Sequence, residues 1–155
     1  MLSKLRQAGG GAFDQGQGGI GPAYYSAFVR APDVDLLLQV DREYREKAAA
    51  GLLQRIAPRS QNPAGEAWLP ILHVGRDGWK FTALFSNTPR AHDLHRAHDW
   101  VVVLYQDGQG VDGQATVVTE WRGALAGRRV VRGREPECAR RYRARPAPVQ
   151  MELEA

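Results

Sequence analysis

Hydrophobic residues recur at every third or fourth position between residues 32 and 53, which predicts an amphipathic helix. Asp33 stands before this stretch and is expected to cap the helix, and Gly51 is expected to end it. A helix of this kind buries one face against the rest of its domain. The apolar positions of the predicted inner face are Leu37, Val40, Tyr44 and Ala48.

Later stretches of the chain have the composition or the alternation of β-strands. The spacing predicts a tight hairpin between residues 68–74 and 79–85, because glycines flank the connection. Pro70 indicates that the first of these strands lies at an edge of the sheet or begins late. Residues 100–105 are a continuous apolar run, typical of a central strand, and residues 114–121 alternate. A last short strand is expected at residues 128–132.

Two short helices complete the predicted elements, one from Thr88 and Pro89 to about residue 97 and one from Glu135 to about residue 145. The fold class is therefore α+β, with a mostly antiparallel sheet of four to five strands, a long N-terminal helix and two short helices. We expect a single domain over residues 23–145. A flexible glycine-rich arm at residues 1–22 precedes it, and a frayed tail at residues 146–155 follows.

Composition suits one globular domain, since 43% of the 155 residues are hydrophobic and 25% are charged. These values exclude collagen-like, mucin-like and wholly disordered chains. There is no run of about eighteen apolar residues and no apolar segment after Met1, so we expect no membrane contact and a cytoplasmic location. Cys138 is the single cysteine, which excludes an internal disulfide.

The net charge of +4 is unevenly distributed along the chain. Nine arginines and two acids lie between residues 122 and 145, so this segment carries +7 and the rest of the chain carries −3. We expect Arg128, Arg132 and Arg134 to alternate on one strand face and to track DNA phosphates without sequence preference. The alternative is a solvated face whose arginines pair with the acids of residues 33–46. The residues expected to contact phosphates are Arg128, Arg129, Arg132, Arg134, Arg140 and Arg141.

Two glycines near the N-terminus suggest a second contact with DNA. Gly19 and Gly21 flank Ile20 in a pattern similar to the hairpin of a helix-hairpin-helix, where backbone N–H groups bind a phosphate. Gly19 and Gly21 are therefore candidate nucleic-acid contacts. The competing interpretation is a plain loop before a short helix.

Two acids offer an alternative chemistry. Asp33 and Asp35 are separated by one residue, as are the carboxylates that bind paired Mg²⁺ in nucleotidyltransferases. The competing interpretation is that both acids stabilise the start of a helix, and it requires no cofactor. The histidines at residues 92, 95 and 98 are candidate zinc ligands. Their spacing of three residues places His98 well round the helix from the other two, which argues against a shared zinc site.

Several strings in the chain carry a resemblance to a known group of proteins. They include Val40-Asp41-Arg42-Glu43-Tyr44-Arg45, Ala67-Trp68-Leu69-Pro70-Ile71-Leu72-His73, Phe81-Thr82-Ala83-Leu84-Phe85-Ser86-Asn87-Thr88, Asp99-Trp100-Val101-Val102, Thr116-Val117-Val118-Thr119-Glu120 and Gly127-Arg128-Arg129-Val130-Val131-Arg132-Gly133-Arg134-Glu135-Pro136-Glu137-Cys138. With these strings, residues 33–142 resemble the C-terminal region of bacterial helix-hairpin-helix DNA-binding proteins related to family X DNA polymerases. The resemblance implies DNA association in a repair-like setting, carried mainly by hairpins upstream of this region. No triad of polymerase carboxylates is matched.

We therefore expect a non-enzymatic, DNA-binding accessory domain with DNA as its partner and no cofactor. Two alternatives stay open. One is a family X polymerase-like nucleotidyltransferase that uses Asp33 and Asp35 with Mg²⁺. The other is a protein-interaction module whose apolar sheet face, which contains Trp68, Trp79 and Trp100, docks to a protein partner.

Overall fold

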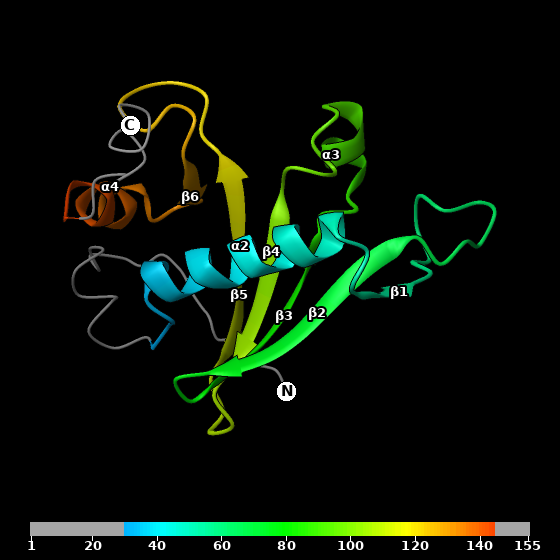
Figure 1. Ribbon diagram of the computed structural model, residues 1–155, viewed down its shortest axis with the longest axis horizontal. Coiled ribbons are helices and arrows are strands. Elements are labelled where there is room, and N and C mark those ends of the chain that lie inside the picture. Colours follow the sequence, from blue (N-terminus) through cyan, green and yellow to red (C-terminus); the bar gives the residue numbers. More distant parts are fainter. Residues whose placement is uncertain (1–29, 145–155) are drawn as a thin grey trace, which may run out of the picture. The chain divides into compact units, whose positions relative to one another are not determined.

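One antiparallel sheet and a helix that crosses it form the centre of the fold (Figure 1). The computed structural model describes residues 30–144. The chain divides between Ala31 and Pro32 into two units, and all of the helices and strands named below belong to the second. They are α2 (Val34–Ala49), β1 (Gln54–Ile56), β2 (Leu69–Arg76), β3 (Trp79–Phe85), α3 (Pro89–Asp93), β4 (Val101–Gln106), β5 (Asp112–Thr119), β6 (Arg129–Val131) and α4 (Glu135–Ala144). The predicted α+β class is confirmed.

The sheet has six strands in the order β1-β2-β3-β4-β5-β6, and every neighbouring pair is antiparallel. The prediction of four to five strands was therefore too low. The additional strand is β1, which has three residues, too few for a sequence alternation to appear. Because β1 pairs with β2 through Arg55 and Pro70, the predicted edge position of β2 was wrong and β1 occupies that edge.

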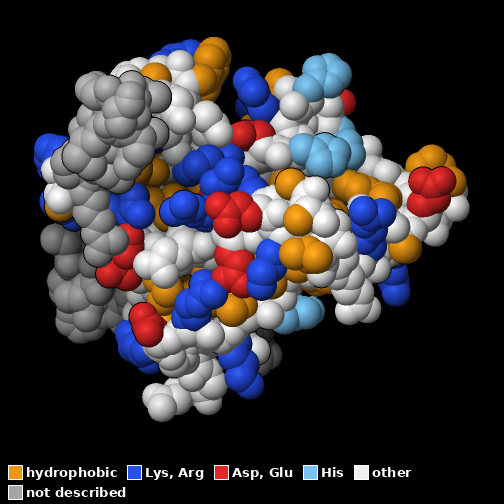
Figure 2. Space-filling model, in the orientation of Figure 1, with side chains coloured by type: hydrophobic (Ala, Val, Ile, Leu, Met, Phe, Trp, Pro, Cys, Tyr) orange, Lys and Arg blue, Asp and Glu red, His pale blue; other side chains and the backbone are white. Residues whose placement is uncertain are grey.

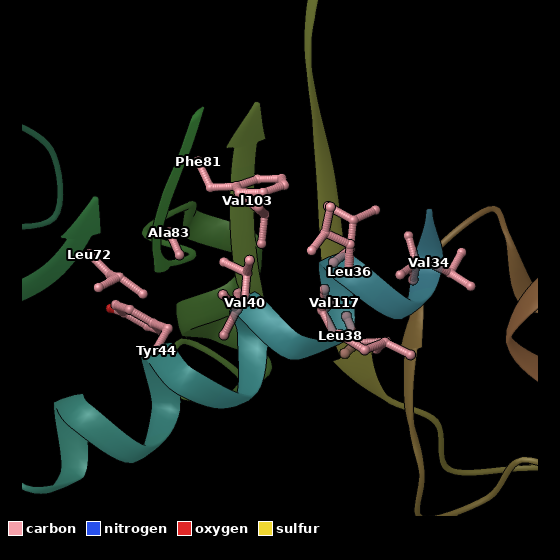
Figure 3. Packing of buried hydrophobic residues seen from close by; sticks show 14 of the residues in the cluster. Val34, Leu36, Leu38, Val40, Tyr44, Leu72, Phe81, Ala83, Val103 and Val117 are labelled. Atoms are coloured by element: carbon pink, nitrogen blue, oxygen red, sulfur yellow. The ribbon is translucent and has the colours of Figure 1, made fainter. Parts of the chain in front are cut away.

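Helix α2 runs across the strands and buries its apolar side against them (Figure 1). Asp33 is its N-cap, as predicted, and accepts a hydrogen bond from the backbone N–H of Asp35. The helix ends at Ala49, and Gly51, with a φ of +71°, turns the chain out of the helix, as predicted. Figure 3 shows Val40 and Tyr44 of α2 pointing toward strand side chains. Leu37, Val40 and Tyr44 are all fully buried.

Tyr44 also joins the helix to two strands by hydrogen bonds. Its hydroxyl donates to the carbonyl oxygen of Pro70 at 2.7 Å and accepts from the backbone N–H of Phe85 at 2.9 Å. Burial raises the pKa of this hydroxyl, and the hydrogen bond from Phe85 opposes that rise only in part. The predicted inner face of the helix is thus confirmed, and the hydroxyl of Tyr44 on that face is satisfied.

The last strand is shorter than predicted. β6 spans Arg129–Val131, so Arg128, Arg132 and Arg134 do not alternate along one strand face, and that prediction was wrong. After β6 the chain turns at Gly133, whose φ is +91°, and enters α4, which packs on β6 and on α2. The terminal helix itself was predicted nearly correctly. None of the helices within residues 30–144 is long and apolar enough to cross a membrane.

Candidate nucleic-acid interface

Arg129 lies between α2 and the sheet rather than on the surface. Its guanidinium donates to both carboxylate oxygens of Asp41 on α2, at 2.7 and 3.2 Å. It also donates to Asp99 at 2.9 Å, to the Thr119 hydroxyl at 3.0 Å and to the Val117 carbonyl at 3.3 Å. These five bonds use the whole donor capacity of a guanidinium. The N–H groups of Arg129, which was predicted to contact DNA phosphates, are therefore all engaged inside the domain.

Asp99 and Thr119 complete the surroundings of Arg129. The carboxylate of Asp99 accepts hydrogen bonds from the backbone N–H and the hydroxyl of Thr119, at 3.0 and 2.7 Å. Burial disfavours the charged form of Asp99, but the two bonds from Thr119 and the charge of Arg129 outweigh burial. The pKa of Asp99 is consequently lower than its ordinary value. This cluster is an internal ion-pair network that joins α2 to β5 and β6.

Three more of the predicted arginines also meet carboxylates. Arg132 pairs with Glu120 and Glu135 at 3.2 and 2.9 Å, and its side chain is 47% exposed. Arg134 forms a bidentate pair with Glu137, with both distances 2.8 Å. It also donates to the carbonyl oxygen of Pro32 at 2.7 Å. Much of the charge of these two residues is thus compensated inside the domain.

Arg141 is the third predicted arginine that meets a carboxylate. It pairs with Asp35 on α2 at 2.6 Å, and both side chains are largely buried. Arg129 and Arg141 therefore bear out the interpretation that arginines of this segment pair with the acids of residues 33–46. The interpretation holds for these two positions only. Arg132 and Arg134 pair instead with Glu120, Glu135 and Glu137, which lie outside residues 33–46.

Arg128 has a different environment, against an aromatic ring. Its guanidinium carbon lies 4.6 Å from the centroid of the Tyr142 ring, and Arg141 lies 5.0 Å from the same centroid. Tyr142 is held in place because its hydroxyl donates to the backbone carbonyl of Arg129 at 2.7 Å. Stacking of this kind fixes the plane of a guanidinium and leaves its N–H edge for other acceptors.

Four arginines of the basic segment form no salt bridge with any carboxylate of residues 30–144. We call them the arginine surface, and they are Arg122, Arg128, Arg140 and Arg143. Arg140 and Arg143 are three residues apart on α4 and are exposed, so they project on the same side of the helix. Arg140 acts on Glu137 only as a nearby charge. Arg122 lies in the loop between β5 and β6.

Elsewhere, positive and negative side chains are interleaved. Figure 2 shows Lys and Arg side chains alternating with Asp and Glu side chains over α2. Arg42 with Glu46 and Lys47 with Glu43 are pairs of this kind, each four residues apart on the helix. The face over α2 is consequently not a continuous basic surface.

The two acids considered for magnesium have partners inside the domain. Asp33 is the N-cap of α2, and Asp35 is engaged by Arg141 and by Gln39, at 2.6 and 3.0 Å. Within the part of the chain that the structure describes, no three His, Cys, Asp or Glu side chains converge as metal ligands would. The geometry of Asp33 and Asp35 therefore fits helix capping and an ion pair better than metal binding.

His92, His98 and Cys138 take structural positions. His92 bonds to the side-chain oxygen of Asn87 at 2.8 Å, and His98 stacks near Trp68 and Phe85. Cys138 is fully buried, and its sulfur accepts a hydrogen bond from the backbone N–H of Val131. Burial raises the pKa of this thiol.

The tryptophans considered for a docking face belong to the core. Trp79 is buried, and Trp68 and Trp100 pack against the core cluster. The fourth, Trp121, is 69% exposed in the loop after β5 and was not singled out from the sequence. A signal was present, because an aromatic residue and an arginine stand side by side just before the turn at Gly123.

A shallow pocket of about 440 Å³ lies over β3, β4 and β5. Thr82 is among its lining residues and alternates with Phe81 and Ala83, which are buried in the core, so the pocket opens on the sheet face away from α2. The lining contains one basic and one acidic side chain, Lys80 and Asp112, and no histidine or cysteine. None of the arginines discussed above reaches this pocket.

Gly19 and Gly21, the candidate hairpin contacts, lie outside the described residues. The structure thus separates the predicted arginines into two groups. Arg129, Arg132, Arg134 and Arg141 are paired with carboxylates, whereas Arg128 and Arg140 belong to the arginine surface.

Comparison of the chain with protein-family models, with curated proteins and with solved structures finds no match.

Proposed function

We propose that this chain is a DNA-binding accessory domain that contacts phosphates without strong sequence preference. The observation that supports the proposal is the arginine surface, since its four guanidinium groups have no salt bridge within residues 30–144 while neighbouring arginines do. A guanidinium whose N–H groups are not committed to carboxylates can bind a phosphate with two parallel hydrogen bonds.

The arrangement of the arginine surface also suits a polyanion. Arg128 is oriented by Tyr142, and Arg140 and Arg143 project from the same helix as that ring. The helix is anchored to the rest of the fold through Cys138, Arg134 and Arg141. Cationic groups held on an ordered scaffold lose little freedom on binding, which favours association.

The resemblance of residues 33–142 to bacterial helix-hairpin-helix DNA-binding proteins supports the same proposal. In that group, phosphate contacts are accompanied by backbone N–H groups of the hairpins, and Gly19 and Gly21 are the corresponding candidates here. The proposed setting is repair-like, because the resemblance extends to proteins related to family X DNA polymerases.

Fluorescence polarisation with a labelled duplex at low salt tests the proposal. The variant Arg128→Ala/Arg140→Ala/Arg143→Ala is expected to weaken binding by about 10- to 100-fold, because it removes three phosphate contacts. The matched control is Arg55→Ala/Arg59→Ala/Arg90→Ala, which removes the same charge from three exposed positions outside the basic segment. Absence of binding by the wild-type chain, or equal losses in both variants, would overturn the proposal.

A further inference from the structure

Trp121 is an exposed aromatic residue in an ordered loop. The loop joins β5 to β6, and its ends are held by hydrogen bonds from Glu120 N–H to the Arg128 carbonyl at 2.9 Å and from Gly127 N–H to the Glu120 carbonyl at 2.6 Å. Leu125 of the same loop packs against the core cluster. The position of Trp121 is therefore set by the fold and not by a free chain end.

The exposure of Trp121 has no counterpart among the other tryptophans, which are all in or against the core. A guanidinium, that of Arg122, lies 4.9 Å from the centroid of its ring. Even with this contact the residue stays 69% exposed, so much of its ring surface is accessible to a ligand. Covering an indole with another flat apolar surface removes it from water, which lowers the free energy.

The loop that carries this ring also carries arginines, and the acidic residue next to the ring, Glu120, is paired with Arg132. Arg122 is the neighbour of Trp121 in sequence, and Arg128 at the other end of the loop is hydrogen-bonded through its backbone to Glu120. The side chain of Arg132 also reaches Glu120, at 3.2 Å. Trp121 thus belongs to the same end of the sheet as the arginine surface, and Tyr142 continues the alternation of aromatic and arginine side chains onto α4.

Alternating aromatic and arginine side chains suit one form of DNA in particular. Proteins that bind single strands combine cations along the backbone with aromatic rings on which bases stack. In a closed duplex the faces of the bases are already stacked on one another, so an exposed indole gains no such contact. The arrangement therefore distinguishes unpaired bases from paired ones.

We infer that Trp121 is a base-stacking residue and that the arginine surface takes single-stranded DNA in preference to closed duplex. This inference rests on the proposed function, since it names the DNA form that the same surface binds. The phosphates of the strand are bound by Arg122 beside the ring and by Arg128 at the other end of the loop, and one base lies on the indole.

Paired titrations with labelled oligothymidine and with a duplex of the same length test the inference. Trp121→Ala is expected to weaken oligothymidine binding by about 10-fold and to leave duplex binding within about 2-fold. Trp121→Phe keeps an aromatic face and is expected to retain most of the affinity. The matched control is Leu52→Ala, because Leu52 is also exposed, at 71%, but lies next to the end of α2.

The outcomes separate this inference from the proposed function. A wild-type chain that binds neither DNA contradicts the proposed function itself. Oligothymidine binding that Trp121→Ala leaves unchanged, or lowers no more than it lowers duplex binding, overturns the stacking role alone. The emission of Trp121, obtained as the difference between wild type and Trp121→Phe, gives a second readout, and we expect oligothymidine to quench it.

Discussion

At the scale of single residues, adjacent arginines with the same chemistry have opposite roles. Arg128 lies against Tyr142 at the surface, whereas Arg129 is enclosed between Asp41 and Asp99. Successive residues of a strand point to opposite faces, so the start of β6 sends Arg129 toward α2. The composition and the charge of the segment do not distinguish Arg128 from Arg129. The register of β6 decides which of the two side chains is enclosed and which lies at the surface.

The buried position of Arg129 leads to a prediction about stability. Arg129→Lys is expected to lower the free energy of unfolding by about 2–4 kcal/mol, because a lysine cannot satisfy both oxygens of Asp41 together with Asp99. Urea unfolding followed by circular dichroism measures the change. DNA binding of the folded variant at low temperature is expected to stay within about 2-fold of wild type. Unchanged stability combined with lost DNA binding would show that Arg129 faces the ligand after all.

At the scale of elements, the sequence predicted the helices and strands with strong periodicity and missed what depends on tertiary pairing. The face of α2, the β2–β3 hairpin and the terminal helix follow from local pattern. β1 has three residues and is held only by its pairing with β2, so no local pattern marks it. The candidate site was less predictable for the same reason, because the ion pairs that join α2 to β6 and to α4 link residues 88 and 106 positions apart.

The contact between Asp35 and Arg141 is the clearest of these pairs and provides the second prediction. A double-mutant cycle with Asp35→Ala and Arg141→Ala is expected to give a coupling energy of about 1 kcal/mol, since the pair is largely but not fully buried. Urea unfolding of the four proteins supplies the values. Additive effects of the two substitutions would mean that the pair does not hold α4 to α2.

At the scale of the whole molecule, the fold redistributes the charge that the sequence concentrates. The described arginines of the basic segment meet six carboxylates, four of which come from outside the segment: Asp35, Asp41, Asp99 and Glu120. The remaining two are Glu135 and Glu137. The arginine surface is what this compensation leaves, and it is smaller than the stripe expected from sequence.

The same ion pairs make stability depend on pH. The pKa of Glu137 is lowered, first of all by its hydrogen bond from Arg134, and the pKa of Asp99 is lowered despite burial by Thr119 and Arg129. The folded-state pKa values lie below those of the unfolded chain, so the stabilisation is present above about pH 4.5 and is lost as the pH falls through the folded-state values. Urea unfolding between pH 7 and pH 3 is expected to show a loss that begins below about pH 4.5.

Asp99→Asn is the control for this acid sensitivity, because an amide does not titrate. The variant is expected to be less stable than wild type at pH 7 and to lose less stability on acidification. A wild-type chain whose stability rises toward pH 3 would contradict the assignment of these carboxylates as stabilising when charged.

The central claim, that the arginine surface binds DNA through phosphates, is tested most directly by the salt dependence of DNA affinity. A plot of log K against log of salt concentration is expected to have a slope of about −3.6 for wild type on duplex, about 0.9 for each of the four arginines engaged. For Arg128→Ala/Arg140→Ala/Arg143→Ala the slope is expected to approach about −1. A wild-type slope near zero, or a slope that the triple substitution leaves unchanged, would contradict the claim.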